Sequence, residues 1–227
     1  MPAERDARTD TGAHHSPLAV GVLVSGRGSN LQAILDAIDR GALAARVAVV
    51  VSNRPGVLAL ARAEQHGIPT AVHERRDYSS RRARDQIILR TLQAHNVELV
   101  VNAGYSAILH RTVVAAYRDH IINIHPSLLP AFAGGMAPKP QADALAAGVK
   151  IAGCTVHVVT EDVDAGPIIA QAAVPVLDDD TTDTLAARIL AAEHRLLPTV
   201  IGWFAAGRLQ VTAGRVLGAP PAMIGGE

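Results

Sequence analysis

Short apolar segments rich in valine and isoleucine alternate along this chain with segments of helical periodicity, and this alternation constrains the fold more than any other feature. The apolar runs are continuous, as is typical of strands covered on both faces of a sheet. The repeated order of strand and helix predicts an α/β fold with a doubly wound, mostly parallel central sheet. The expected strands are residues 18–24, 46–52, 69–72, 97–103 and 121–125, and the expected helices 31–40, 57–66, 80–95, 111–117 and 141–147.

The last third of the chain predicts a different arrangement. Two strand-like runs flank the acidic segment T-E-D-V-D-A-G and predict a late antiparallel hairpin, at residues 151–159 and 167–176. A long last helix follows, for which Asp180 or Thr181 is a suitable cap, as Ser79 or Ser80 is for the helix at 80–95. Residues 209–212 are expected to add an edge strand. We expect a disordered tail at 1–17, a single domain at 18–213 and a loose C-terminal tail at 214–227.

The composition argues against several classes of protein. Lys plus Arg and Asp plus Glu are equal at 21 each, so no overall attraction to nucleic acid or to an acidic membrane is expected. The N-terminal segment lacks the apolar core of a signal peptide, and no apolar run approaches the roughly 20 residues that span a bilayer. The single cysteine, Cys154, is expected in the core and fits a reducing cytoplasm. We expect a cytoplasmic monomer or homodimer that acts on small molecules.

Two polar side chains interrupt the apolar run I-I-N-I-H. Asn123 and His125 are two residues apart, so in a strand they project from the same face. Pro126 ends regular strand pairing directly after them, and strand ends are where open α/β sheets bind ligands. Taken alone, the two residues fit a strand end with a loop-bonding amide and a half-buried histidine better than a catalytic pair.

The glycine-rich segment S-G-R-G-S-N, residues 25–30, lies between the first expected strand and the first expected helix. Backbone N–H groups at a helix N-terminus bind phosphate, and Gly26 and Gly28 would allow a close approach. A dinucleotide fingerprint would need a third glycine, where Leu31 stands. Two interpretations remain, a phosphate site for a ligand smaller than a dinucleotide and a tight turn with Asn30 as the helix cap.

Asp164 lies in the acidic loop of the expected hairpin, where most aspartates only form turns. Beside Asn123 and His125, a carboxylate would favour the charged form of the imidazole. Asn and His side chains can stabilise an oxyanion, and His can carry a proton, so the three residues together fit acyl transfer without a protein nucleophile. The spacing of His120, His125, His157 and Asp164 matches no metal-ligand pattern, and no metal is expected.

Several longer motifs occur together and in a fixed order: S-G-R-G-S-N-L-Q-A-I, A-G-Y-x-x-I-L, N-I-H-P-S-L-L-P, A-G-C-T-V-H, D-V-D-A-G-P-I-I-x-Q and A-E-H-R-L-L-P. Over residues 19–211, the chain closely resembles the phosphoribosylglycinamide formyltransferases. The resemblance implies that a formyl group passes from 10-formyltetrahydrofolate, as co-substrate, to the amine of glycinamide ribonucleotide in de novo purine biosynthesis.

The resemblance also implies roles for individual residues. Asn123, His125 and Asp164 match the catalytic trio of the family. The substrate ribose would be held by Glu193, and its phosphate by Gly28, Ser29 and Asn30. The folate would be bordered by Arg81, Tyr105, Ser106, Ala107, Ile108, Leu109, Val159, Thr160 and Glu161.

Two segments depart from the family pattern. Ser106 and Ala107 stand where the family usually has Met-Arg, so only backbone contacts to the pterin are expected there. The loop at residues 131–140 is longer than usual, lacks the usual Pro-Gly and has no periodicity, so it is expected to be a mobile lid.

Other functions predict other sequence features. Formyltetrahydrofolate deformylase, a hydrolase, resembles the same half of the chain, but it carries an extra N-terminal regulatory domain for which the short tail leaves no room. Methionyl-tRNA formyltransferase would need a basic RNA-binding domain, which the neutral charge disfavours. A catalytically silent protein that binds folate or sugar phosphate would not need all three residues of the trio.

Overall fold

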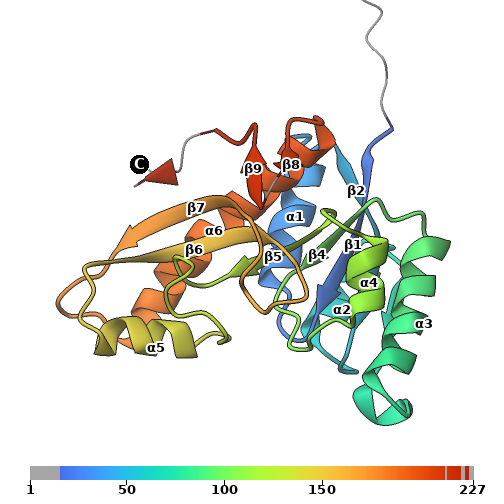
Figure 1. Cartoon of the computed structure of the whole chain (residues 1–227), viewed down its shortest axis with the longest axis horizontal. Coiled ribbons are helices and arrows are strands. Elements are labelled where there is room, and N and C mark those ends of the chain that lie inside the picture. Colours follow the sequence, from blue (N-terminus) through green and yellow to red (C-terminus); the bar gives the residue numbers. More distant parts are fainter. Residues whose placement is uncertain (1–15, 213, 221–222, 225–227) are drawn as a thin grey trace, which may run out of the picture.

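The apolar runs pair into one eight-stranded sheet, within the residues that the computed structural model describes (16–212, 214–220 and 223–224). The strand order is β10-β7-β6-β5-β4-β1-β2-β3 (Figure 1). The strands of this sheet are β1 (Leu18–Val24), β2 (Ala45–Ser52), β3 (Thr70–Val72), β4 (Leu99–Asn102), β5 (Ile121–His125), β6 (Ile151–Val158), β7 (Ile168–Pro175) and β10 (Met223–Ile224). The helices are α1 (Ser29–Asp39), α2 (Leu58–Gln65), the 3-10 turn η1 (Arg75–Asp77), α3 (Arg81–Ala94), α4 (Arg111–Ala116), α5 (Lys139–Ala146) and α6 (Thr182–Ala205).

The direction of the strands confirms the doubly wound, mostly parallel sheet. β3, β2, β1, β4 and β5 are parallel neighbours. The chain builds from β1 outward to β3 and then continues with β4 on the other side of β1, so the order reverses between β1 and β4. β6 is antiparallel to both β5 and β7, which confirms the late hairpin. β10 pairs in parallel with β7, beyond the hairpin.

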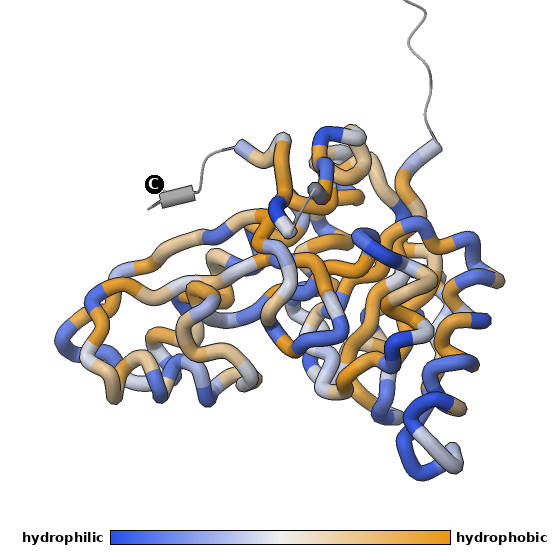
Figure 2. The backbone as a smooth tube through the Cα atoms, viewed as in Figure 1, coloured by the Kyte–Doolittle hydropathy of each residue, from blue (hydrophilic) through white to orange (hydrophobic). Residues whose placement is uncertain are grey.

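Helices cover both faces of the sheet and enclose two hydrophobic cores. On one face, α1, α2, α5 and α6 pack on the strands, and on the other face α3 and α4 do so. β1 contributes side chains to both cores. Val20 and Val22 point to the first core, under α1, α2, α5 and α6, and Ala19 and Leu23 point to the second core, under α3 and α4. Figure 2 shows the central strands as mainly hydrophobic, as strands buried on both faces should be.

Two of the expected helix caps are present. Ser80 accepts a hydrogen bond from the N–H of Ala83 at the start of α3, and Thr181 accepts one from Thr184 at the start of α6. Cys154 lies buried in the first core, as expected. In the part of the chain that the structure describes, no helix is long and apolar enough to cross a membrane.

The C-terminal segment differs from the expectation. β8 (Gln210–Thr212) does not extend the main sheet but pairs with β9 (Arg215–Leu217) in a separate antiparallel hairpin. The reason is packing, because Val211 and Val216 lie together against the first core. The segment 214–227, expected to be loose, therefore contains β9 and β10 in its described part. Residues 1–15 of the expected N-terminal tail lie outside the described residues.

Candidate active site

A cavity of about 550 Å³ opens at the carboxyl ends of β1, β4 and β5. Its volume is that of a small-molecule site, and it lies at the point where the strand order reverses, which is where doubly wound sheets bind ligands. Arg81, the first residue of α3, is exposed and does not line the cavity, whereas every other residue assigned to the site by resemblance does. The lining consists of residues 26–30, 102–109, 123–126, 134–137, 157, 159–164, 190 and 193.

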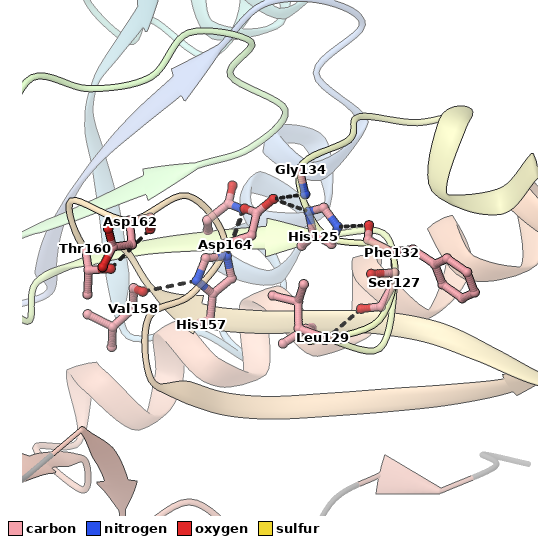
Figure 3. Close-up of polar contacts among 12 residues, drawn as sticks. His125, Ser127, Leu129, Phe132, Gly134, His157, Val158, Thr160, Asp162 and Asp164 are labelled. Atoms are coloured by element: carbon pink, nitrogen blue, oxygen red, sulfur yellow. Dashed lines mark hydrogen bonds and ion pairs between the residues drawn. The ribbon is translucent and has the colours of Figure 1, made fainter. Parts of the chain in front are cut away.

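The structure brings Asn123, His125 and Asp164 together at the wall of this cavity. Figure 3 shows His125 beside Asp164. His125 is 3% exposed, and its Nδ1 lies 3.4 Å from Oδ2 of Asp164. Asp164 comes from the loop between β6 and β7 and has a positive φ of 52°, which is rare outside glycine. The turn thus directs this carboxylate at the end of β5, and an acid, an imidazole and an amide face one cavity.

His157 is a fourth member of the cluster and fixes the orientation of Asn123. The two residues are directly paired across β5 and β6, and Nδ2 of Asn123 lies 3.0 Å from Nε2 of His157. Burial lowers the pKa of His157, so its ring is neutral near pH 7. The carbonyl of Val158, 3.1 Å from Nδ1, can only accept, so Nδ1 carries the proton of the neutral ring. Nε2, which also lies 3.6 Å from Oδ1 of Asp164, is then the acceptor. Asn123 therefore presents its amide nitrogen to His157 and keeps a second N–H for a ligand.

The loop expected at residues 131–140 as a mobile lid ends at Pro138, where α5 begins, and it is attached to the same cluster. Nε2 of His125 lies 3.2 Å from the carbonyl of Phe132, and Gly134 donates its N–H to Asp164 at 2.9 Å. Ser127 donates its hydroxyl to the carbonyl of Ala131 at 2.6 Å. The loop thus closes one side of the cavity through bonds to His125 and Asp164.

The glycine turn has the geometry of an anion site. Gly28 caps α1 in the left-handed conformation with a φ of 72°, and a Cβ atom on it would lie 2.6 Å from the Cβ of Ala59. Only glycine fits such a position. Asn30 is therefore not the cap; it lies in the first turn of α1, and its Nδ2 donates to Glu193 at 2.7 Å. The N–H groups of the first helical turn are left for a ligand.

Glu193 contacts this turn from α6, although it lies 163 positions after Asn30 in the sequence. It is buried, and burial raises the pKa of its carboxyl group to about 7, against the hydrogen bond from Asn30, which lowers it. Its second oxygen remains available, since the bond from Asn30 engages Oε2. The carboxylate is placed to accept hydrogen bonds from a polar ligand in the cavity.

The loop after β4 is fixed from two sides. The hydroxyl of Ser25 accepts a bond from the N–H of Ser106 at 2.8 Å, and Asn53 donates to the Ser106 hydroxyl at 3.1 Å. From α3, the buried Asp85 accepts the N–H of His110 at 2.6 Å. Ser106 therefore holds this loop in place through its backbone N–H and its hydroxyl. Burial raises the pKa of Tyr105 to about 12, so its phenol stays neutral in the wall.

A comparison with known proteins identifies the family to which this fold and cavity belong. The family described as formyl transferase matches residues 18–201, which is most of the chain. The chain belongs to the formyl transferase family. The match covers every residue of the cluster around His125, both ends of the cavity wall and the five parallel strands β1 to β5.

Named relatives of this formyl transferase are similar over most of its length. A phosphoribosylglycinamide formyltransferase from Haemophilus influenzae is 41% identical over 192 residues, which are 85% of this chain and 89% of that protein. A crystal structure of glycinamide ribonucleotide transformylase 1 from Symbiobacterium toebii has a TM-score of 0.87 at 46% identity and covers 93% of this chain and 98% of that one.

Longer relatives contain a similar segment. The trifunctional purine biosynthetic protein adenosine-3 from Gallus gallus is 45% identical over 198 residues, which are 87% of this formyl transferase and 19% of that protein. This chain thus spans about a fifth or less of the length of such trifunctional relatives.

Sequence reasoning gave His157 no catalytic role in this formyl transferase. The signal was available, because His157 interrupts the apolar run of β6 as Asn123 interrupts that of β5. The metal set considered from sequence is only partly assembled, since His120 lines a different hollow, beside Phe204. Within the described residues, no group of three or more His, Cys, Asp and Glu side chains is arranged to hold a metal ion.

Proposed function

We propose that this chain transfers the formyl group of 10-formyltetrahydrofolate to the amine of glycinamide ribonucleotide, a step of de novo purine biosynthesis. One observation carries the proposal: the cluster of Asn123, His125 and Asp164 shares a single cavity with the phosphate-sized turn at Gly28. The relatives from Haemophilus influenzae and Bacillus subtilis, both named phosphoribosylglycinamide formyltransferase, support it.

The reaction needs a positioned oxyanion site and a route for protons. The substrate amine attacks the formyl carbon, a carbon–nitrogen bond forms, and the carbonyl electrons move to oxygen. Collapse of this tetrahedral intermediate breaks the bond to the folate nitrogen. That nitrogen gains one proton and the attacking amine loses one, so no other reactant is required.

The cluster is suited to both tasks. Asn123, held by His157, has an N–H to donate to the developing oxyanion. Nδ1 of His125 faces Asp164, so His125 can donate to the same oxygen and carry the proton between the two nitrogens through Nε2, which must exchange the carbonyl of Phe132 for the ligand. Asp164, 3.4 Å from Nδ1, balances the charge of that imidazolium and holds the ring in place.

The remaining residues would bind the two substrates. We assign the phosphate to the N–H groups of Gly28, Ser29 and Asn30, and the ribose hydroxyls to Glu193. The folate pterin would lie against residues 105–109 and 159–161 of the lining. Arg81 is exposed outside the lining, so we assign it only to a part of the folate that extends from the cavity.

The main alternative is hydrolysis of the same folate. A crystal structure of a formyltetrahydrofolate deformylase from Pseudomonas syringae has a TM-score of 0.82 at 28% identity. The match covers 89% of this chain and 66% of that one. In the alternative, water takes the place of the amine.

Tetrahydrofolate formation, followed with and without glycinamide ribonucleotide, separates the hypotheses. We expect product only with the nucleotide. Equal product without it would establish a deformylase, and none in either case would favour a binding protein.

The setting proposed for this reaction is the cytoplasm, with the chain as a monomer or homodimer. The equal numbers of acidic and basic residues, 21 each, and the single cysteine, Cys154, support a reducing compartment and small-molecule partners rather than nucleic acid or membrane.

A further inference from the structure

The glycine turn is attached to α2 by a side chain that does not line the cavity. Arg62 donates from Nε to the carbonyl of Arg27 at 3.0 Å and from Nη1 to the side-chain oxygen of Gln32 at 2.7 Å. It is half-buried and absent from the lining residues. One guanidinium thus joins the turn to both α1 and α2, which are neighbours in Figure 1.

A second bond from α2 holds the preceding peptide of the turn. The N–H of Ala59 donates to the carbonyl of Gly26 at 3.1 Å, so two successive carbonyls of the turn are bound to α2. In a trans peptide the C=O and the following N–H point in opposite directions. The N–H groups of Arg27 and Gly28 are therefore directed away from α2, on the side where the cavity lies.

The charge of Arg62 remains largely available to the turn. Among the described residues, no carboxylate oxygen lies within ion-pair distance of its guanidinium. Its partners are a carbonyl and the amide of Gln32, which in turn donates to Asp36 at 2.8 Å. The positive charge lies directly behind a peptide whose N–H faces the cavity, where it favours a dianionic ligand.

We propose that Arg62 is a positioning residue for the substrate phosphate: it fixes the peptide between Arg27 and Gly28 and adds positive potential behind it, without touching the ligand. This inference rests on the proposed function, because it requires a phosphate in the glycine turn. It concerns binding alone, since the side-chain hydrogen bonds of Arg62 go to Arg27 and Gln32 and not to the cluster around His125.

The test compares how much each Arg62 variant loses with a substrate that carries the phosphate and with one that lacks it. Steady-state kinetics of Arg62→Ala would be measured with glycinamide ribonucleotide and with the same compound lacking its phosphate. We expect the KM for the nucleotide to rise about tenfold, the scale of one lost hydrogen bond from a charged group, with kcat within twofold. The KM for the folate, and kcat/KM for the dephosphorylated substrate, should stay at the wild-type values.

Three further variants separate charge, bond and fold. Arg62→Lys keeps the charge and Arg62→Gln keeps a donor, so both should lie between the wild type and Arg62→Ala, and they provide the test if Arg62→Ala does not fold. Arg90→Ala, an exposed arginine of α3, should match the wild type. Equal losses with and without the phosphate, or no loss with either, would overturn the positioning role. A wild-type chain that forms no product with glycinamide ribonucleotide would instead refute the proposed function.

Discussion

Asn123 and His125 leave β5 side by side, but their neighbours give them different roles. Asn123 is oriented by a neutral histidine, which uses one of its two N–H donors. His125 lies between the carboxylate of Asp164 and the carbonyl of Phe132, so each ring nitrogen faces an acceptor. Both contacts fix the orientation of the ring, and the contact with Asp164 brings a carboxylate next to it.

Replacement of Asp164 tests this assignment. Asp164→Asn removes the counter-charge of the imidazolium but keeps the size of the side chain. We expect kcat to fall by about 100- to 1000-fold, within the range of general acid–base catalysis, and its pH dependence to move. Profiles of kcat against pH would be compared with those of Asp178→Asn, a fully exposed acid after β7. Full activity with an unchanged profile would reduce Asp164 to a turn residue.

Glu193 makes the stability of the fold depend on pH. Its pKa is about 7 in the folded chain and about 4.3 in an unfolded one, so between these values the folded state holds a proton that the unfolded state has lost. The contribution of this group to the free energy of unfolding is therefore full below about pH 4.3 and falls as the pH rises towards 7, by on the order of 3 kcal/mol. Denaturant unfolding of the wild type and of Glu193→Gln checks this. The difference between the two proteins should change over this range and be constant above it; parallel curves would contradict the shift.

At the scale of elements, the site is an assembly of segments that follow different strands. Ser25 follows β1, Asn53 follows β2, and Ser106 lies beyond β4, yet their side chains form one hydrogen-bonded group. The group joins the turn at Gly28 to the loop that would carry the folate. Neither loop is held by sheet pairing at this point, so these bonds determine their spacing.

Loss of Asn53, which bonds both Ser25 and Ser106, should loosen the folate loop. For Asn53→Ala we expect the KM for the folate to rise about fivefold, since a hydrogen bond contributes about 1 kcal/mol, with kcat little changed. Ser106→Ala removes the bond between Asn53 and Ser106 from its other end and also the hydroxyl bond to Ser25, so the double variant should lose less than the sum of the two single losses. Fully additive losses would mean that the two side chains act separately.

At the scale of the whole molecule, the cavity is lined by residues far apart in the sequence, from Gly26 to Glu193. A ligand that bridges these segments binds the folded state only and must stabilise the fold. At 100 times its dissociation constant, glycinamide ribonucleotide should add about 2.7 kcal/mol. Thermal unfolding should then shift upward by about 5–10 °C. Gly28→Val, which cannot accommodate a phosphate in the turn, is the control, and an equal shift in both proteins would place the ligand elsewhere.

The sequence alone determined the sheet and the location of the chemistry. Continuous apolar runs, each followed by a helical period, specify parallel strands, and polar residues at the ends of such runs, as at Asn123 and His125, mark the ligand edge. Local signals also identified Thr181 as a cap and the late hairpin. These features depend on residues near one another in the chain, which periodicity and turn chemistry can report.

Only the tertiary structure decided which distant residues meet. Asn30 bonds Glu193 across 163 positions, His157 turns the amide of Asn123, and Arg62 holds a carbonyl 35 positions away. Each contact follows from strand order and register or from helix packing, which hydrophobic periodicity does not encode. The same reason explains the hairpin of β8 and β9, because Val211 buries its side chain against the first core rather than at the sheet edge.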